Sequence, residues 1–156
     1  MIKNYGLFWK KEHVFWGKKN NPGSLLGARS RSIKARSVDF RDQRGIYALY
    51  ADYELVYLGQ AGSGQRRMFA RIKEHLDDHL VERWNRFSWF GTQWVTADGL
   101  SADTSVIGDS VNIVLNKLEA VTIAIAEPNL NLQRGRWGDS VQYYQVRDQR
   151  LQENGG

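Results

Sequence analysis

The segment GIYALYADYELVYLG at positions 45–59 constrains the fold of this chain more than any other. Ile46–Tyr50 and Leu55–Leu58 are short and rich in β-branched and aromatic residues, and a polar turn separates them. This pattern predicts two antiparallel strands joined as a β-hairpin. Tyr47 and Tyr57 are placed near the outer ends of the two strands, so we expect their side chains to approach each other across the hairpin.

Two glycines, Gly45 and Gly59, flank the tyrosine pair. Because glycine has no Cβ, a phosphate group could approach the backbone at these positions. The alternative interpretation is that these tyrosines and glycines are ordinary residues of a sheet. The following loop, Gln60–Gly64, is flexible and turn-forming, and no Gly-Lys-Ser/Thr follows it, which excludes a P-loop.

A helix is predicted after this loop, from about Gln65 to Arg83. Its apolar positions recur at every fourth residue, at Met68, Ile72, Leu76 and Leu80. A neighbouring stripe holds Arg67, Arg71 and His75 at the same spacing. A guanidinium here can donate to two phosphate oxygens and hold the charge that builds at phosphorus. The alternative is a solvated basic helix face.

A third, strongly aromatic strand is predicted at Phe87–Val95 and a polar surface loop at Ala97–Asp109. A second helix is predicted at about Val111–Ala126. Glu119 lies at the edge of the apolar face of this helix, where a carboxylate is costly without a partner. That partner is either a hydrated Mg²⁺ or an arginine.

These residues, taken in order, resemble the GIY-YIG endonuclease superfamily over roughly residues 44–132. The matching pieces are GIY at Gly45–Tyr47, YLG in place of YIG at Tyr57–Gly59, Arg71 with His75, Glu119, and the P-x-L-N segment Pro128–Asn131. Leu58 replaces the family's isoleucine conservatively. Gln60 stands where many members carry lysine, so activation of the nucleophile by a lysine is in doubt here.

The resemblance implies a mixed α/β (α+β) fold, in which a small central antiparallel sheet of about three strands is flanked by helices. To this core we add an N-terminal β-hairpin with a basic extension, and an extra C-terminal strand at Val141–Val146. We expect one domain over residues 1–156, divided into the basic extension (1–44), the nuclease core (44–132) and a C-terminal strand and tail (133–156).

The resemblance also implies roles for the site residues. Tyr47, or Tyr57 in its place, helps to activate or position the water that attacks phosphorus. Arg71 stabilises the charge of the transition state, and His75 assists Tyr47 or the proton relay. An ordinary tyrosine has a pKa near 10 and is a poor base at about pH 7, unless Arg71 or a metal lowers that value.

The expected cofactor is a single Mg²⁺ or Mn²⁺, which Glu119 ligates while Asn131 fixes the geometry near Glu119. A metal ion acidifies bound water and stabilises the leaving oxygen. The expected substrate is DNA, because most members of the family that this chain resembles act on DNA. Nothing in the residues themselves distinguishes DNA from RNA. We expect cleavage that is structure-selective or weakly sequence-specific, or else an enzyme that gains specificity from a homodimer or a targeting partner.

The positive charge of the chain is concentrated at its N-terminus. Residues 1–44 hold eleven Lys/Arg against three Asp/Glu, a net charge of +8, and residues 45–156 hold eleven against fourteen, a net charge of −3. Leu7–Trp9 and Val14–Trp16 are predicted to form a short hairpin, Lys18–Gly23 a turn, and Arg29–Arg36 a basic loop. Such a segment neutralises phosphates regardless of sequence.

The residues that we predict to contact nucleic acid are Lys18, Lys19, Arg29, Arg31, Lys34, Arg36, Arg67, Arg134 and Arg136. The alternative is a basic surface without a partner. No helix-turn-helix or zinc-finger pattern accompanies these residues, so sequence-specific DNA reading by this chain alone is not supported.

The chain has no cysteine, which excludes disulfides, zinc–thiolate sites and cysteine nucleophiles. No apolar run is long enough to span a membrane, and Met1–Lys11 lacks a signal-peptide core, so we expect a cytoplasmic protein. Two other functions fit the same residues. One is a catalytically silent nucleic-acid-binding module of the same fold, and the other is a protein-interaction domain that uses these residues only in its core and salt bridges.

Overall fold

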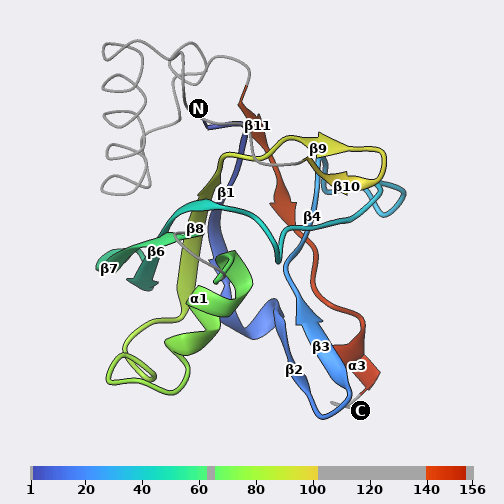
Figure 1. The fold of residues 1–156 in the computed structure, drawn as a ribbon. Coiled ribbons are helices and arrows are strands. Elements are labelled where there is room, and N and C mark those ends of the chain that lie inside the picture. The colour runs from blue at the N-terminus through green and yellow to red at the C-terminus, as the bar shows by residue number, and fades with distance from the viewer. Residues whose placement is uncertain (1, 63–65, 102–139, 154–156) are drawn as a thin grey trace, which may run out of the picture.

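The computed structural model describes residues 2–62, 66–101 and 140–153. Its centre is a five-stranded sheet with the order β11-β1-β8-β6-β7 (Figure 1). All neighbouring strands are antiparallel except β1 and β11, which are parallel. The strands of this sheet are β1 (Asn4–Lys10), β6 (Gly45–Ala51), β7 (Glu54–Ala61), β8 (Arg86–Gly91) and β11 (Val141–Gln142).

The predicted β-hairpin is confirmed as β6 and β7, which pair in antiparallel register. Tyr47 lies opposite Gly59, and a register shift between Leu49 and Tyr50 marks a bulge before the turn. Asp52 occupies the turn with a φ of 57°, a left-handed conformation that Asp and Asn tolerate better than most residues. On its other side β6 pairs with β8, so the strand of Tyr47 lies inside the sheet.

Three smaller sheets complete the β-structure of the described residues. They are the hairpin of β2 (Phe15–Lys18) and β3 (Asn21–Ser24), the hairpin of β9 (Val95–Thr96) and β10 (Gly99–Leu100), and the sheet β12-β4-β5, with β4 at Leu26–Ala28, β5 at Val38–Asp39 and β12 at Tyr144–Gln145. The predicted pairing of Leu7–Trp9 with Val14–Trp16 is wrong. β1 pairs with β8, because its aromatic side chains pack there, and β2 pairs with β3.

The predicted fold class, a three-stranded sheet flanked by helices, is also wrong. The described part of the chain is mostly β, with several sheets and little helix. Its helices are α1 (Met68–Glu74), the short α3 (Arg150–Glu153) and the 3₁₀ turn η1 (Lys11–His13). Because the N-terminal residues form strands that pack into the core, the sheet gains neighbours that a three-stranded core lacks. The helix predicted at Val111–Ala126 lies outside the described residues.

Helix α1 covers one face of the central sheet but is much shorter than the predicted helix Gln65–Arg83 (Figure 1). It ends at Glu74 because the following residues form successive turns. The backbone N–H of His75 bonds to the carbonyl of Ile72, and the Asp78 side chain accepts the N–H of Leu80. Aspartate side chains compete with helix hydrogen bonds in this way.

The core between α1 and the sheet is strongly aromatic. Trp9 makes an edge contact with Trp89 at 5.4 Å between ring centroids, and Phe40 lies 4.5 Å from Trp89. Trp89 and Phe40 are fully buried. Aromatic pairs of this kind add about 0.5–1.5 kcal/mol each beyond the area that they bury. The N-terminal residues therefore belong to the same core as the hairpin.

The third predicted strand, Phe87–Val95, is divided in the structure. β8 ends at Gly91 because Gln93 leaves the sheet for a buried polar network. Its backbone N–H donates to the Oε1 of Gln43 at 3.0 Å, and its carbonyl accepts Nδ2 of Asn4 at 2.8 Å. Buried amides need such partners, and strand pairing cannot supply them.

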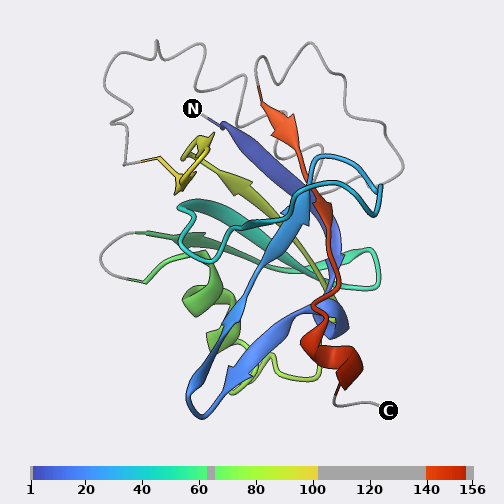
Figure 2. The same ribbon diagram turned by 90° about the vertical axis from the view of Figure 1, so that its right-hand side faces the viewer.

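The C-terminal strand predicted at Val141–Val146 is divided into β11 and β12, which join different sheets. After β12 the chain returns to the β2–β3 hairpin, where α3 lies beside it (Figure 2). Arg150 donates to both carboxylate oxygens of Asp148 and to Ser24 of β3. These hydrogen bonds from Arg150 lower the pKa of Asp148 to about 2. Within the described ranges, no helix has the length and apolar character needed to cross a membrane.

Candidate active site

Tyr47 lies at the centre of the candidate site, on the face of β6 that α1 covers. Its side chain is completely buried, next to Leu49 and Ile72 in the same core. Opposite it, Gly59 makes room for the ring, because a Cβ there would lie 2.4 Å from Cζ of Tyr47 and 2.5 Å from its hydroxyl oxygen. The space at Gly59 is therefore taken by a tyrosine rather than left for a phosphate.

Gly45 also serves packing inside the fold. Its φ of +148° is disfavoured for other residues, and a Cβ at this position would lie 1.8 Å from the carbonyl oxygen of Phe90 on β8. Glycine is thus required for β6 to lie against β8. The structure gives both glycines of the motif an internal role, in place of the approach to phosphate that we expected.

A chain of hydrogen bonds runs from Tyr47 through His75 to Asp78. The hydroxyl of Tyr47 lies 2.8 Å from Nε2 of His75, which is itself buried. The other ring nitrogen, Nδ1, lies 2.7 Å from Oδ2 of Asp78. Asp78 was missed in the sequence, although its spacing of three residues from His75 is typical of side chains that meet on one side of a helical turn.

Asp78 determines which nitrogen of His75 carries the proton. Burial alone would raise the pKa of Asp78, but the Leu80 N–H and the His75 imidazole hold it below its ordinary value. Asp78 is therefore a carboxylate at neutral pH and accepts the Nδ1 proton. In a neutral imidazole, Nε2 is then left as an acceptor, so Tyr47 donates its hydroxyl proton to His75.

The pKa of Tyr47 is raised to about 12, chiefly by burial. The positive charge of Arg71 acts in the opposite direction but is the weaker influence. We expected Arg71 to lower the pKa of this tyrosine so that it could act as a base at neutral pH. In the structure the pKa of Tyr47 is instead above its ordinary value. Tyr47 stays a neutral phenol, and its proton can leave only together with the arrival of another.

Tyr57 lies on β7 beside this chain and is only partly buried. Its ring centroid is 6.1 Å from that of Tyr47 and 4.7 Å from that of His75. Its presence adds to the rise in the pKa of Tyr47 that burial causes. The predicted approach of the two tyrosines across the hairpin is confirmed, and Tyr57 is the one nearer to solvent.

Arg71 extends from α1 toward β7 and is held at both ends of its guanidinium. Its Nε donates to the backbone carbonyl of Gln60 at 3.0 Å, and a terminal nitrogen donates to Glu74 at 2.9 Å. Glu74 also accepts Arg66 at 2.7 Å. Gln60 thus contributes to the site through its backbone, which any residue at this position supplies.

The structure brings together four of the predicted catalytic residues: Tyr47, Tyr57, Arg71 and His75. The other two, Glu119 and Asn131, lie outside the described residues. Across ranges 2–62, 66–101 and 140–153, no three or more His, Cys, Asp or Glu side chains gather as a metal-binding group. The described carboxylates beside Arg71 and His75, Glu74 and Asp78, already accept hydrogen bonds from these two residues.

The predicted nucleic-acid-binding residues do not form one surface. Lys18 and Lys19 are exposed at the turn of the β2–β3 hairpin, whereas Arg31 and Arg36 are exposed in the segment between β4 and β5, at the opposite end of the molecule (Figures 1 and 2). Arg36 donates to the carbonyl of Ala97 at 2.9 Å.

The remaining members of this predicted set are placed as follows. Arg29 and Lys34 are exposed in the same segment as Arg31, and Arg67 is half-buried at the start of α1. Arg134 and Arg136 lie outside the described residues. The basic N-terminal sequence is therefore spread over several elements of the fold.

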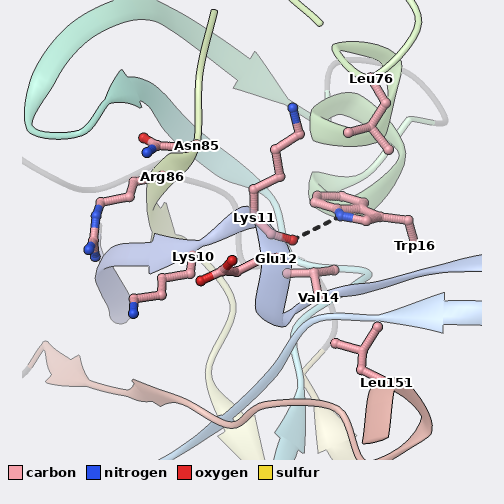
Figure 3. A pocket seen from close by; sticks show the side chains of 9 residues that line it. All are labelled: Lys10, Lys11, Glu12, Val14, Trp16, Leu76, Asn85, Arg86 and Leu151. Atoms are coloured by element: carbon pink, nitrogen blue, oxygen red, sulfur yellow. Dashed lines mark hydrogen bonds between the residues drawn. The ribbon is translucent and has the colours of Figure 1, made fainter. Parts of the chain in front are cut away.

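A pocket of about 540 Å³ lies near η1, with Leu76, which follows α1, in its lining (Figure 3). Lys11, one of its lining residues, has its ammonium nitrogen 2.6 Å from the carbonyl of Val81 and 4.3 Å from the ring of Trp84. Burial lowers the pKa of Lys11. With its ammonium bound in this way, Lys11 ties η1 to the turns after α1.

No protein-family model, curated protein or solved structure matches this chain.

Proposed function

We propose that this protein is a metal-dependent endonuclease of the GIY-YIG type, which hydrolyses phosphodiester bonds in DNA. The observation that carries the proposal is the hydrogen-bonded chain Tyr47–His75–Asp78, with Tyr57 and Arg71 beside it. The chain can carry away the proton of an attacking water, and the guanidinium of Arg71 can stabilise the negative charge that develops on the phosphate.

Protons move along this chain in a concerted relay. Tyr57, the tyrosine nearer to solvent, accepts a proton from the attacking water and passes its own proton to Tyr47. Tyr47 in turn gives its proton to Nε2 of His75. Each tyrosine gains one proton as it loses one, so no phenolate accumulates and the pKa of about 12 at Tyr47 is no obstacle. The Asp78 carboxylate stabilises the imidazolium that forms.

Arg71 is the residue that we propose to bind the phosphate undergoing attack. The Gln60 carbonyl and Glu74 fix its guanidinium before substrate arrives, so little reorganisation is needed in the transition state. Arginine is suited to this role because its planar guanidinium donates two parallel hydrogen bonds to a phosphate.

Glu119 is the side chain that we propose to hold Mg²⁺ or Mn²⁺, with Asn131 beside it. A divalent ion held by Glu119 would stabilise negative charge on the phosphate oxygens. The two described carboxylates near the site, Glu74 and Asp78, already accept hydrogen bonds from Arg66, Arg71 and His75. We therefore assign the metal to a different carboxylate, that of Glu119.

The substrate that we propose is DNA cut in a structure-selective or weakly sequence-specific way, in the cytoplasm. RNA carries the same scissile group and remains a substrate to be tested. One site cuts one strand, so a double-strand break requires two protomers or two encounters. The basic residues spread over both ends of the fold would contribute phosphate contacts.

A cleavage assay tests the proposed function directly. We expect the wild type to cut at least one of supercoiled plasmid, linear duplex, branched DNA, single-stranded DNA and RNA in Mg²⁺ or Mn²⁺, and not in EDTA. Glu119→Ala should abolish cutting, whereas Glu54→Ala, which removes an exposed glutamate of the hairpin, should not. Cutting that survives EDTA or Glu119→Ala would contradict the proposal, and binding without cutting would favour a silent binding module.

Asp78→Asn tests the proton relay. The Asn oxygen can still cap Leu80, but its amide donates where Oδ2 accepted, which forces the His75 proton onto Nε2. We expect cleavage to slow by about 10²–10⁴-fold, because the tautomer of His75 that accepts from Tyr47 is lost.

The matched control is Asp77→Asn, which removes the same charge from an exposed neighbour. Its cleavage rate and pH profile should remain those of the wild type. If Asp78→Asn slows cleavage no more than Asp77→Asn does, or if Asp78→Asn unfolds the protein, the relay is not supported.

A further inference from the structure

A second pocket, of about 230 Å³, lies between β1, β8 and β12, and its lining is strongly basic. Four of its residues are Lys10, His13, Arg31 and Arg86, and none of the lining residues is Asp or Glu. The pocket is smaller than the roughly 300–1,000 Å³ typical of sites for drug-sized ligands. Its volume and charge suit a small anion.

The two arginines of this basic pocket are held by neutral groups. A terminal nitrogen of Arg86 donates to the carbonyl of Phe8 at 3.2 Å, and its guanidinium lies over the ring of Tyr53. Arg31 lies over the ring of Tyr144, with its Cζ 4.8 Å from the ring centroid. These contacts orient each guanidinium without neutralising it, so the positive charge of the pocket is retained.

Lys10, at the end of β1, also lines the pocket, and its backbone is held by Gln145 of β12. Its N–H donates to Oε1 of Gln145 at 2.6 Å, and its carbonyl accepts Nε2 of Gln145 at 2.9 Å. Lys10 and Arg86 also line the neighbouring pocket of Figure 3, where the side chain of Lys11 extends away from both. Of the two adjacent lysines, Lys10 at the end of β1 lines both pockets, whereas Lys11 of η1 lines only the pocket of Figure 3.

The backbone of β1 is distorted where it borders this pocket. Phe8 has a φ of 52°, unusual for a bulky residue, at the register shift between Gly6 and Trp9. The distortion lets its N–H bond to Ser88 and its carbonyl hold Arg86. Bulges of this kind re-aim side chains and are frequent beside functional sites.

The positive field of the pocket acts on His13. Burial lowers the pKa of His13, and the charges of Lys10, Arg147 and Arg86 lower it further. Glu12 acts in the opposite direction from the neighbouring pocket of Figure 3, which Lys10 and Arg86 also line. An anion bound among these groups would relieve the repulsion, and His13 would report its arrival.

We infer that this basic pocket is a phosphate-binding site, formed by Lys10, His13, Arg31 and Arg86 and separate from the candidate active site. A phosphate has several acceptor oxygens and no donor when fully ionised, which matches a lining of cationic donors. The phosphate comes either from a nucleic-acid backbone or from a free phosphate or nucleotide. The inference does not depend on the proposed nuclease activity.

NMR titration of the His13 imidazole with inorganic phosphate, in EDTA, tests the inference. We expect saturable shifts in the wild type and a higher His13 pKa with phosphate bound. Arg31→Gln should weaken phosphate binding by about tenfold, because one charge-assisted contact is lost. Arg83→Gln, the same substitution at an exposed arginine outside the lining, should leave the affinity unchanged.

Two further titrations identify the source of the phosphate. A short duplex that produces the same His13 shifts, and that Arg31→Gln weakens equally, identifies a backbone phosphate. Shifts with phosphate or a mononucleotide alone identify a free ligand. Absence of saturable shifts with all three ligands, or equal weakening by Arg83→Gln, would overturn the inference. Tyr57→Phe should keep phosphate binding while it stops cleavage, so the two proposals fail independently.

Discussion

Replacing either tyrosine of the site by phenylalanine should slow phosphodiester cleavage by about 10²–10⁴-fold, the usual contribution of general acid–base catalysis. In the proposed relay, Tyr57→Phe removes the hydroxyl that receives the proton of the attacking water. Tyr47→Phe removes the link to His75, whose Nε2 lies 2.8 Å from the Tyr47 oxygen. Single-turnover rates on the preferred DNA substrate measure both effects.

The double variant separates a relay from two independent contributions. If the tyrosines act in one proton chain, Tyr47→Phe with Tyr57→Phe should be no slower than the worse single variant, because either change interrupts the chain. Multiplying effects would contradict the relay. Tyr53→Phe is the matched control, since Tyr53 is an exposed tyrosine of the same hairpin, and it should cleave at the wild-type rate.

Arg71→Ala should reduce the cleavage rate by about 10²–10³-fold, the loss expected when one preorganised donor to the transition state is removed. The effect should fall mainly on the rate of the chemical step, because the guanidinium is held in place by Gln60 and Glu74 before substrate binds. Single-turnover rates at saturating protein, together with the DNA affinity, distinguish this from a loss of binding.

Arg66→Ala is the matched control for Arg71→Ala. Both arginines donate to Glu74, at 2.7 Å from Arg66 and 2.9 Å from Arg71, so both substitutions remove an ion pair from the same carboxylate. Arg66 is the more exposed of the two, and only Arg71 acts on the Tyr47 hydroxyl. Equal losses of cleavage rate in the two variants would show that the ion pairs of Glu74 are what cleavage requires. Such a result would contradict the proposal that Arg71 binds the phosphate.

The helix after the hairpin shows why periodicity alone was insufficient. The apolar spacing from Met68 to Leu80 predicted one long helix, and the residues of this stripe do face the core. However, Asp78 accepts hydrogen bonds from His75 and Leu80 in the structure, and these bonds accompany turns rather than helix. Spacing predicts which side chains are buried, and it does not weigh a side-chain hydrogen bond against a backbone one.

The fold class was wrong for a similar reason. The strands formed by residues 4–39 are short, and several pair with partners distant in the sequence, as β1 does with β8 and β12 does with β4. Such pairings depend on which aromatic faces meet, for example Trp9 against Trp89, and no local pattern encodes that meeting.

The sequence by itself determined the β6–β7 hairpin and the proximity of Tyr47 and Tyr57, because alternation along a strand and a short turn fix register locally. Only the tertiary structure decided that Tyr47 is buried with a raised pKa, that Asp78 orients His75, and that Gly59 makes room for a ring. Burial and hydrogen-bond partners depend on what the other elements bring to the site, and these quantities set the chemistry of its side chains.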